Sequence, residues 1–179
     1  MDSCDDSILI ESVKRLKLIV SDVDGCLSNG KLIYDGGECQ ELKVFDVKDG
    51  FAVHLARRFG IETAIITGRE SKALSRRVKE LGIQDCFQGY SDKASAWKKI
   101  KQKYSLKDSE IAFLGDDLLD LNLLQRSGVS FAPIDAVADV KERVDVQLKA
   151  EGGSGAFREM VEMILKVKGK WKEVLEVYL

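Results

Sequence analysis

An α/β fold, in which helices cover both faces of a parallel sheet, is predicted by two features of this sequence. Short apolar runs of strand length recur along the 179 residues, and amphipathic helical segments lie between them. Runs that are apolar throughout, rather than at every second position, are typical of strands covered on both faces, as in parallel sheets. Strand–helix alternation further predicts a three-layer, Rossmann-like arrangement with right-handed crossovers.

Four apolar runs are the expected strands of this sheet: Leu18–Ser21, Ala64–Thr67, Ile111–Leu114 and Val129–Ala132. Three segments between or after them repeat apolar residues at helical spacing: Ala52–Phe59, Leu74–Leu81 and Phe157–Ile164. Asp92 is placed to cap a further helix that carries Trp97. The basic stretch "KVKGKWKEV" near the C-terminus is interpreted as a solvated tail.

One segment departs from the alternation. Two β-like runs, Lys31–Tyr34 and Glu41–Phe45, flank "DGG", which predicts a β-hairpin over about residues 28–47. A two-stranded hairpin is marginally stable in water by itself. We therefore expect its apolar side chains to pack against something else, and another subunit is a candidate.

Composition limits the possible functions. The length and the lack of a linker predict one domain over residues 1–179, with residues 1–15 as an N-terminal extension. A net charge of -2 gives no basic field for nucleic acid, no apolar run has the length of a membrane span, and the acidic N-terminus does not resemble a secretory signal. The four cysteines form no CxxC pair, which argues against a zinc site or a disulfide framework and favours a reducing, cytoplasmic location.

Polar side chains follow each expected strand at its carboxyl end, where ligands bind in open α/β sheets. They are Asp22 and Asp24 after the first strand, Thr67-Gly68-Arg69 after the second, Lys93 after a short strand-like segment near Cys86–Phe87, and Asp116, Asp117 and Asp120 after the next. If the sheet is parallel, these groups converge on one edge.

Such a cluster of carboxylates needs compensation, because like charges in a low dielectric repel one another. An oxygen-ligated Mg²⁺ would supply it. One carboxylate could then attack phosphorus, and a second, two residues later, could carry a proton to the leaving oxygen. A threonine hydroxyl and a lysine ammonium could hold the phosphoryl oxygens.

The motifs "DVDGCL", "IITGR", "DK" and "GDDLLD", in this order, resemble the four motifs of haloacid dehalogenase-type phosphatases. The resemblance implies Asp22 as the nucleophile that becomes an aspartyl phosphate and Asp24 as the general acid/base. It implies Thr67 and Lys93 as stabilisers of the phosphoryl group. It also implies a Mg²⁺ site formed by Asp22, Asp24 (through its backbone carbonyl) and Asp116, with Asp117 and Asp120 in support.

The chain between these motifs is too short for a cap domain. With "VKDG", "QGYSDK" and "GGSGAFRE", it is similar to the 3-deoxy-D-manno-octulosonate 8-phosphate phosphatases of bacterial lipopolysaccharide synthesis. That similarity implies a capless, Mg²⁺-dependent homotetramer, assembled through the hairpin, that acts on a small phosphorylated sugar acid. Gly68, Arg69, Lys48 and Arg158 are the implied substrate-binding residues.

The sugar acid itself is left open by one departure from the family pattern. Lys48 stands where the octulosonate enzymes usually carry Arg, so the bidentate fork for a carboxylate is lost. A nine-carbon 2-keto-3-deoxy sugar acid 9-phosphate is the alternative substrate. Relatives of that specificity tend to have an acidic residue after "ITG", and Arg69 at this position favours the eight-carbon compound.

Each candidate also has an ordinary structural reading. Asp116 and Asp117 could cap a helix, Asp120 and Lys93 could lie on a solvated helix face, and Arg158 could follow a flexible glycine loop. Two other classes of protein remain: a receiver-like phosphoacceptor domain, which would form a stable phosphoprotein, and a catalytically silent tetramerisation module. Rapid turnover of a phosphomonoester would exclude the first, and a comparison of Asp22→Asn with the wild type would separate the second.

Overall fold

The computed structural model describes residues 3–36 and 41–179, so Met1, Asp2 and the turn of the predicted hairpin lie outside it. Strands in this part of the chain are β1 Leu18–Ser21, β2 Ile33–Tyr34, β3 Glu41–Leu42, β4 Glu62–Ile66, β5 Asp85–Phe87, β6 Ile111–Leu114, β7 Val129–Ala132 and β8 Val146–Gln147. Helices are α1 Ser3–Arg15, α2 Val47–Arg58, α3 Lys72–Leu81, α4 Lys93–Tyr104, α5 Leu121–Arg126, α6 Ala138–Lys141, α7 Ala156–Val167 and α8 Trp171–Glu176, with 3-10 turns at Asp108–Glu110 and Leu118–Asp120.

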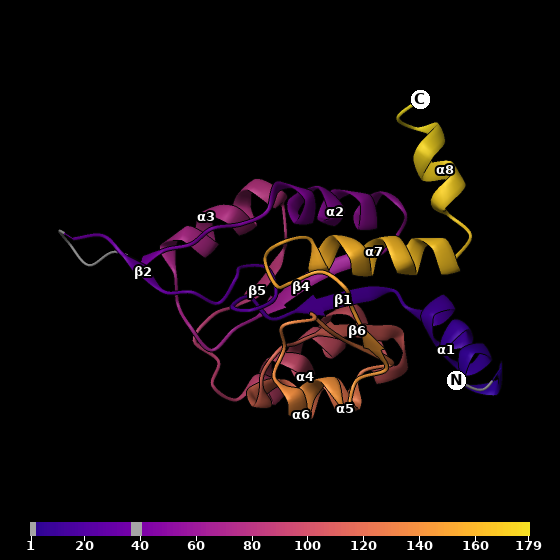
Figure 1. Cartoon of the computed structure of the whole chain (residues 1–179), viewed down its shortest axis with the longest axis horizontal. Helices are drawn as coiled ribbons and strands as arrows, with labels where there is room; N and C mark the ends of the chain where they lie inside the picture. Colours follow the sequence, from indigo (N-terminus) through magenta and orange to yellow (C-terminus); the bar gives the residue numbers. More distant parts are fainter. Residues whose placement is uncertain (1–2, 37–40) are drawn as a thin grey trace.

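The predicted parallel sheet is confirmed. Six strands pair in parallel in the order β5-β4-β1-β6-β7-β8, and β2 and β3 form a separate antiparallel hairpin. Figure 1 shows α2, α3 and α7 over one face of the sheet, α4, α5 and α6 over the other, and the hairpin extending away from the body. The described residues contain no separate cap domain, as expected.

Alternate residues of each strand supply two cores, one on each face. Ile19 and Ile65 pack with α2 and α7, whereas Val20 and Ile66 pack with Trp97 of α4. All of these side chains are buried. The continuous apolar runs therefore reflect burial on both faces, because successive strand side chains point to opposite faces.

The strand ends and helix caps lie at, or close to, the positions that the sequence predicts. The second strand covers Glu62–Ile66, so Thr67 is the first residue beyond it. The Asp92 side chain accepts a hydrogen bond from the backbone N–H of Ala94 and caps α4, as predicted. In the described part of the hairpin the paired strands are shorter than expected, with Ile33 opposite Leu42 and Tyr34 opposite Glu41.

The interpretation of "KVKGKWKEV" as a solvated tail is wrong. Residues Trp171–Glu176 form α8, Val174 is buried in the core beside α7, and Trp171 packs against that core. The Trp171 ring also lies beneath the cationic groups of Arg158 and Lys166. An apolar residue among lysines can serve as an anchor because the lysine stems cover apolar surface while their charges stay in water. Across residues 3–36 and 41–179, no helix is both long and apolar enough to pass through a lipid bilayer.

Candidate active site

The carboxyl ends of β1, β4 and β6 lie level with one another. Ser21 pairs with Ile65 of β4 and with Leu114 of β6, so the residues that follow these strands emerge side by side. A pocket of about 170 Å³ opens there, lined by Asp22, Asp24, Thr67, Gly68, Arg69, Lys93, Asp116, Asp117, Leu119 and Asp120. The structure thus brings together all the candidate site residues except Lys48 and Arg158.

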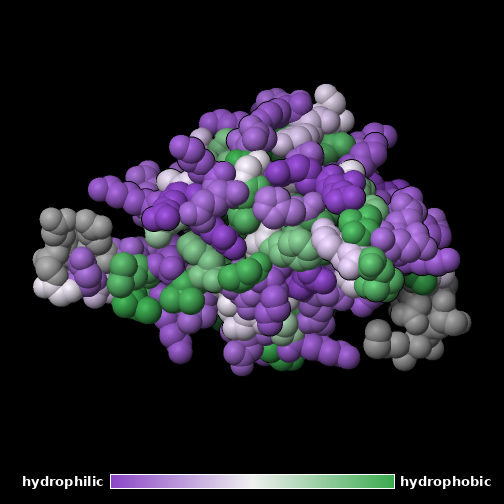
Figure 2. Space-filling view, turned by 90° about the horizontal axis from the view of Figure 1, so that it is seen from above, coloured by the Kyte–Doolittle hydropathy of each residue, from purple (hydrophilic) through white to green (hydrophobic). Residues whose placement is uncertain are grey.

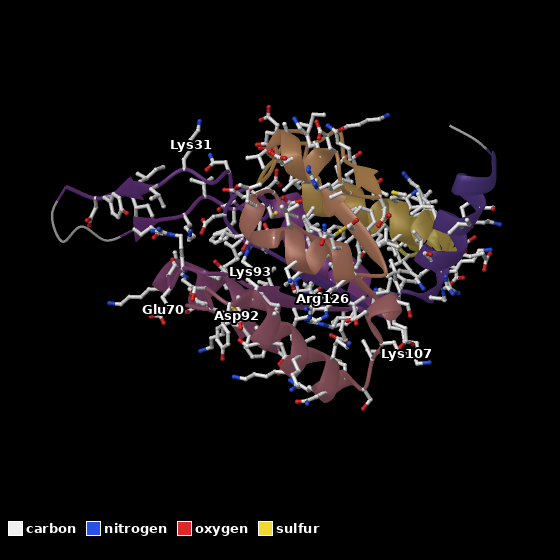
Figure 3. The ribbon with its side chains drawn as sticks, turned by 90° about the horizontal axis from the view of Figure 1, so that it is seen from below. Lys31, Glu70, Asp92, Lys93, Lys107 and Arg126 are labelled. Atoms are coloured by element: carbon white, nitrogen blue, oxygen red, sulfur yellow. The ribbon has the colours of Figure 1, made fainter. Side chains whose placement is uncertain are left out.

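Lys93 links two carboxylates in the interior of this site. Its ammonium lies 2.8 Å from Oδ1 of Asp22 and 2.6 Å from Oδ1 of Asp120, and all three side chains are buried. Burial opposes protonation of Lys93, but the two carboxylates outweigh it and raise the pKa of the lysine. Figure 3 shows Lys93 beside Asp92 at the N-terminal end of α4, which directs it into the site. A solvated position for Lys93 or Asp120 is therefore excluded.

Asp120 also organises the loop that carries Asp116. Its Oδ2 accepts the backbone N–H of Asp116 at 3.0 Å and that of Asp117 at 3.4 Å. Asp117 itself is exposed, and its carboxylate caps the following 3-10 turn by accepting the N–H of Leu118 at 2.7 Å. The helix-cap reading of Asp117 is the one that the geometry shows.

Two carboxyl groups of the site have pKa values well above the ordinary value of an aspartate. Burial, followed by repulsion from Asp120, raises the pKa of Asp22 to about 7 despite the opposing effect of Lys93. Burial, followed by repulsion from Asp22 and Asp120, raises the pKa of Asp116 to about 8. A bound cation would favour the ionised form of both groups.

The donor set fits a divalent cation. Ligand atoms of Asp22, Cys26 and Asp116 all lie within 4.8 Å of one another. Carboxylate oxygens are what Mg²⁺ prefers, whereas burial raises the pKa of the Cys26 thiol and keeps it a neutral, poor ligand for that ion. Asp22 and Asp116 would therefore hold Mg²⁺ through their side chains. The Asp24 carboxylate is directed toward the hairpin instead, so only its backbone carbonyl could take part, as the resemblance implies.

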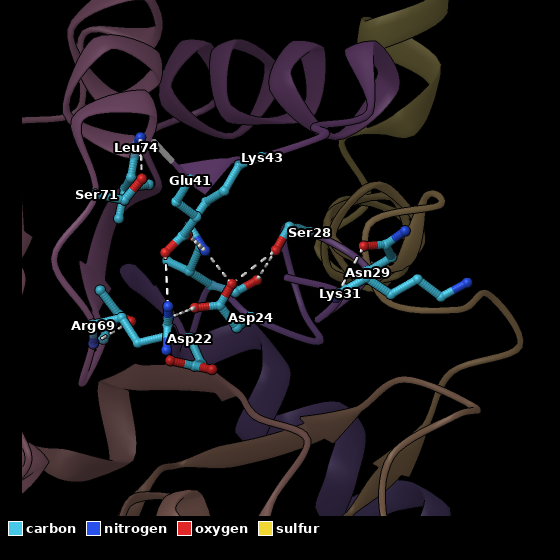
Figure 4. A network of polar contacts seen from close by, with 12 residues as sticks. Asp22, Asp24, Ser28, Asn29, Lys31, Glu41, Lys43, Arg69, Ser71 and Leu74 are labelled. Carbon is cyan, nitrogen blue, oxygen red and sulfur yellow. Dashed lines mark hydrogen bonds and ion pairs between the residues drawn. The ribbon is translucent and has the colours of Figure 1, made fainter. Parts of the chain in front are cut away.

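Asp24 lies in a polar network at the base of the hairpin (Figure 4). Its Oδ1 accepts hydrogen bonds from Ser28 Oγ, at 3.2 Å, and from the Lys43 ammonium. Glu41 pairs with Lys43 at 2.7 Å through Oε1 and with Arg69 at 2.7 Å through Oε2, and Arg69 Nε lies 3.9 Å from Oδ2 of Asp24. The hairpin is therefore tied directly to the second carboxylate of "DVDG".

Thr67 is buried at the end of β4. Its hydroxyl accepts the backbone N–H of Arg69 at 3.2 Å, and its own N–H donates to the carbonyl of Phe87 at 2.9 Å. These bonds fix the tight Thr67-Gly68-Arg69 turn at the pocket wall, where hydroxyl and N–H groups could meet an anion.

A glycine loop braces the strand end that carries Asp22 and Asp24. Gly25 has φ +91°, and a side chain there would begin 2.0 Å from Oδ2 of Asp116. Against this turn packs Gly152, where an added Cβ would lie 1.8 Å from the Gly25 carbonyl oxygen. Gly153 donates its N–H to the carbonyl of Cys26 at 2.8 Å. Both segments thus approach more closely than side chains would permit.

Comparisons with known proteins agree with this geometry. Residues 85–158 match the family model of the haloacid dehalogenase-like hydrolases. The chain is 38% identical over 165 residues to the 3-deoxy-D-manno-octulosonate 8-phosphate phosphatase KdsC of Escherichia coli, covering 92% of this chain and 87% of that protein. The chain belongs to the haloacid dehalogenase-like hydrolases, and within them it is closely related to KdsC.

Solved structures of relatives have the same fold. The 3-deoxy-D-manno-octulosonate 8-phosphate phosphatase of Moraxella catarrhalis, in complex with magnesium, phosphate and KDO, is 36% identical with a TM-score of 0.92, over 97% of this chain and 99% of that one. The enzyme of the same name from Yersinia pestis is 33% identical with a TM-score of 0.89, over 92% and 89%.

Two candidate residues of this haloacid dehalogenase-like hydrolase lie apart from the pocket. The Lys48 side chain is 71% exposed and lies 3.8 Å from Asp46. The Arg158 guanidinium donates to Glu162 at 2.7 Å and lies over the rings of Phe51 and Trp171. In this chain neither cation reaches the pocket, and their roles in substrate binding stay predictions.

Sequence reasoning missed Lys43, Glu41 and Leu119. Glu41 and Lys43 are two residues apart in a β-like run, so their side chains point to the same face of the strand. This two-residue spacing is the feature of the sequence that could have grouped them. The pattern does not reveal what the face contacts, because charged residues in a hairpin are ordinarily solvated. Leu119 lines the pocket from the 3-10 turn and is largely exposed, which the motif "GDDLLD" did not indicate.

Proposed function

We propose that the chain is a Mg²⁺-dependent phosphomonoesterase that hydrolyses 3-deoxy-D-manno-octulosonate 8-phosphate. The observation that carries the proposal is the grouping of Asp22, Asp24, Lys93 and Asp116 around one pocket at the carboxyl edge of the sheet. Support comes from the Moraxella catarrhalis relative, whose structure contains magnesium, phosphate and KDO. A cytoplasmic location accompanies this proposal, with Cys26 and Cys86 present as free thiols.

In the proposed reaction, a carboxylate oxygen of Asp22 forms a bond to phosphorus as the sugar oxygen leaves. Asp24 gives that oxygen a proton, and the product is an aspartyl phosphate on Asp22 plus the free sugar acid. Asp24 then takes a proton from water, the water oxygen attacks phosphorus, and the bond to Asp22 breaks. Phosphate and the original carboxylate are the products, so atoms and charge balance.

The other pocket groups act electrostatically. Lys93, 2.8 Å from Oδ1 of Asp22, orients that carboxylate and offsets negative charge on the phosphoryl group. The Thr67 hydroxyl and the N–H groups of its turn are placed to hold phosphoryl oxygens. Mg²⁺, when bound by Asp22 and Asp116, would offset further charge on phosphoryl oxygens.

Arg69 is the pocket cation best placed to meet a sugar carboxylate, because it lines the pocket and Lys48 does not. Both candidate sugar acids carry a carboxylate, so it is the residue type after "ITG", Arg69 rather than an acidic residue, that favours the eight-carbon compound. The test is a comparison of kcat/KM for the two 2-keto-3-deoxy sugar acid phosphates with Mg²⁺ present. A preference for the nine-carbon compound would overturn the substrate assignment, and a stable phosphoprotein without turnover would overturn the enzyme class.

We also propose assembly into a homotetramer through the hairpin. Its apolar side chains are exposed in the isolated chain: Leu32, Ile33, Tyr34, Leu42 and Val44. Figure 2 shows apolar residues gathered along the hairpin. A run of exposed apolar residues on a two-stranded hairpin is typical of a protein interface.

A further inference from the structure

Among the described residues of the hairpin, Lys43 has the most buried charged side chain. It follows β3, yet its side chain is only 2% exposed, because it turns inward to the base of the hairpin. There its ammonium contacts the carboxylates of Asp24 and Glu41 (Figure 4). A lysine charge is rarely taken out of water without such partners, because the loss of its hydration is strongly unfavourable.

The two oxygens of Asp24 have different surroundings. Oδ1 accepts hydrogen bonds from Lys43 and from Ser28. Oδ2 is buried and accepts no hydrogen bond from the described residues. A carboxyl group that exchanges a proton with a substrate needs one oxygen held and the other available. Asp24 lines the pocket, and the Nε of Arg69 that faces Oδ2 lies 3.9 Å away, beyond hydrogen-bond distance.

Glu41 offsets part of the positive charge around Asp24. Its carboxylate lies 2.7 Å from the Lys43 ammonium and counters the charge that Lys43 brings. Arg69, whose Nε lies 3.9 Å from Oδ2 of Asp24, is the second cation of this network, so its two acidic and two basic side chains balance one another. Lys43 can therefore orient the carboxylate by a hydrogen bond within a network that carries no net charge. The same glutamate holds Arg69 at 2.7 Å, so the network connects three separate segments of the chain.

We propose that Lys43, held by Glu41, is a positioning residue for Asp24. It fixes the carboxylate that protonates the leaving oxygen, so the hairpin base takes part in the chemistry as well as in the shape of the molecule. This inference rests on the proposed phosphatase function. The competing explanation is that Lys43 only anchors the hairpin.

The two explanations differ in how the rate depends on the leaving group. Ring-substituted phenyl phosphates, from phenyl to 2,4-dinitrophenyl, have similar shapes but leaving oxygens of very different basicity. A poor leaving group needs the proton from Asp24, and a good one leaves without it. The value of kcat/KM covers only the steps up to departure of the leaving group, so it isolates proton donation from the later attack of water.

The decisive experiment measures kcat/KM across this series for the wild type, Lys43→Met and the control Lys31→Met. Lys31 is exposed on the same hairpin and points away from it (Figure 3). We expect Lys43→Met to lose on the order of 10²-fold on phenyl phosphate and less than about threefold on 2,4-dinitrophenyl phosphate. Lys31→Met should match the wild type on both, and Lys43→Arg should recover part of the loss on phenyl phosphate.

An equal loss on both esters, or no loss on either, would overturn the positioning role and leave the phosphatase proposal standing. A wild type that hydrolyses neither ester would instead overturn the proposed function. Where Lys43→Met does not fold, Glu41→Gln provides the same test, because it removes the charge that balances Lys43. A steeper leaving-group dependence in that variant supports the proposal, and an unchanged dependence contradicts it.

Discussion

Asp22, Asp116 and Asp120 illustrate how single residues determine this site. Burial makes their negative charges unfavourable, and Lys93 compensates two of them by direct contact. Asp116 has no such cation among its contacts in the described chain; Cys26 Sγ lies 3.7 Å from its Oδ1. A divalent cation would compensate the negative charge that remains.

The raised pKa values predict how metal and pH together change stability. Folded Asp22 and Asp116, with pKa values of about 7 and 8, bind protons more tightly than the unfolded chain, in which an aspartate has its ordinary pKa of 3.8. Without metal, these two groups therefore lower stability as pH rises from about 4 to about 8, and their effect is constant above that range. Mg²⁺ binds the ionised forms, so it should raise the thermal midpoint more at pH 8 than at pH 5.

Differential scanning calorimetry in EDTA and in Mg²⁺, at both pH values, would check this expectation. Asp116→Asn should lose most of the Mg²⁺-dependent increase at pH 8. An equal increase at pH 5 and pH 8 would contradict the coupling of metal binding to proton release.

Replacing the proposed nucleophile gives a second prediction. Asp22→Asn should lower kcat on a phosphomonoester by on the order of 10⁴-fold or more, because the amide cannot form the aspartyl phosphate. Folding should be retained, since the amide has nearly the same shape and Lys93 keeps Asp120 as its partner. Circular dichroism and steady-state hydrolysis would test both parts, with exposed Asp139→Asn as the matched control. Wild-type turnover by Asp22→Asn would show that the nucleophile assignment is wrong.

The sequence correctly predicted the site residues that belong to a motif and also follow a strand. Asp22, Thr67, Lys93 and Asp116 each follow a strand of a parallel sheet, and topology alone places such residues together. Lys43 could not be predicted in this way. Its partner, Asp24, lies 19 residues earlier in the chain, and their contact depends on how a short hairpin folds back onto the strand end.

At the scale of elements, α2 and α7 show how a buried charge can join two helices. Asp49 of α2 is buried, and its carboxylate accepts the N–H of Gly155 at 3.2 Å and that of Arg158 at 2.8 Å. These are among the N–H groups that the start of a helix leaves without partners inside the helix. Burial raises the pKa of Asp49 to about 6 against the effect of these two bonds. Sequence reasoning missed this contact because it joins segments far apart in the chain.

We expect Asp49→Ala to lower the free energy of unfolding by about 1–3 kcal/mol, because two buried N–H groups lose their acceptor. Urea denaturation would measure the change. His54→Ala, an exposed substitution on the same helix, should change stability by less than about 0.5 kcal/mol. Similar midpoints for the two variants would argue against a helix-joining role for Asp49.

The ends of helices could be predicted from the sequence where one capping residue determines them. Gly82 ends α3 and Asp92 begins α4, as their residue types predict. Helix α8 could not be predicted from its lysine-rich composition, because burial of Trp171 and Val174 depends on the position of α7. Short strand β8 likewise depends on pairing with β7 rather than on its own pattern.

At the scale of the whole molecule, alternate residues of the second hairpin strand have opposite character. Glu41 and Lys43 are turned into the body, where they pair with each other, whereas Leu42 and Val44 between and beside them expose apolar side chains. Leu32 is 47% exposed and Val44 is 58% exposed. The proposed assembly would bury these side chains between copies of the chain.

Charges on this apolar surface should therefore change assembly without changing the fold. We expect the double variant Leu32→Glu, Val44→Glu to reduce the mass measured by light scattering after size exclusion to that of a smaller species. Buried like charges at an interface are strongly unfavourable. Lys31→Glu, close to Leu32 but already polar, is the control. An unchanged mass in the double variant would place the assembly interface elsewhere.

The alternation of inward polar and exposed apolar residues in the hairpin has a consequence for how such proteins diverge. The exposed apolar residues can be exchanged through evolution or by grafting, and the number of copies in the assembly can change with them. Replacement of Glu41 or Lys43 is constrained by Asp24 and therefore by turnover. A chimera that takes the exposed hairpin residues from a relative but keeps these two residues should adopt the donor's assembly while preserving the recipient's chemistry.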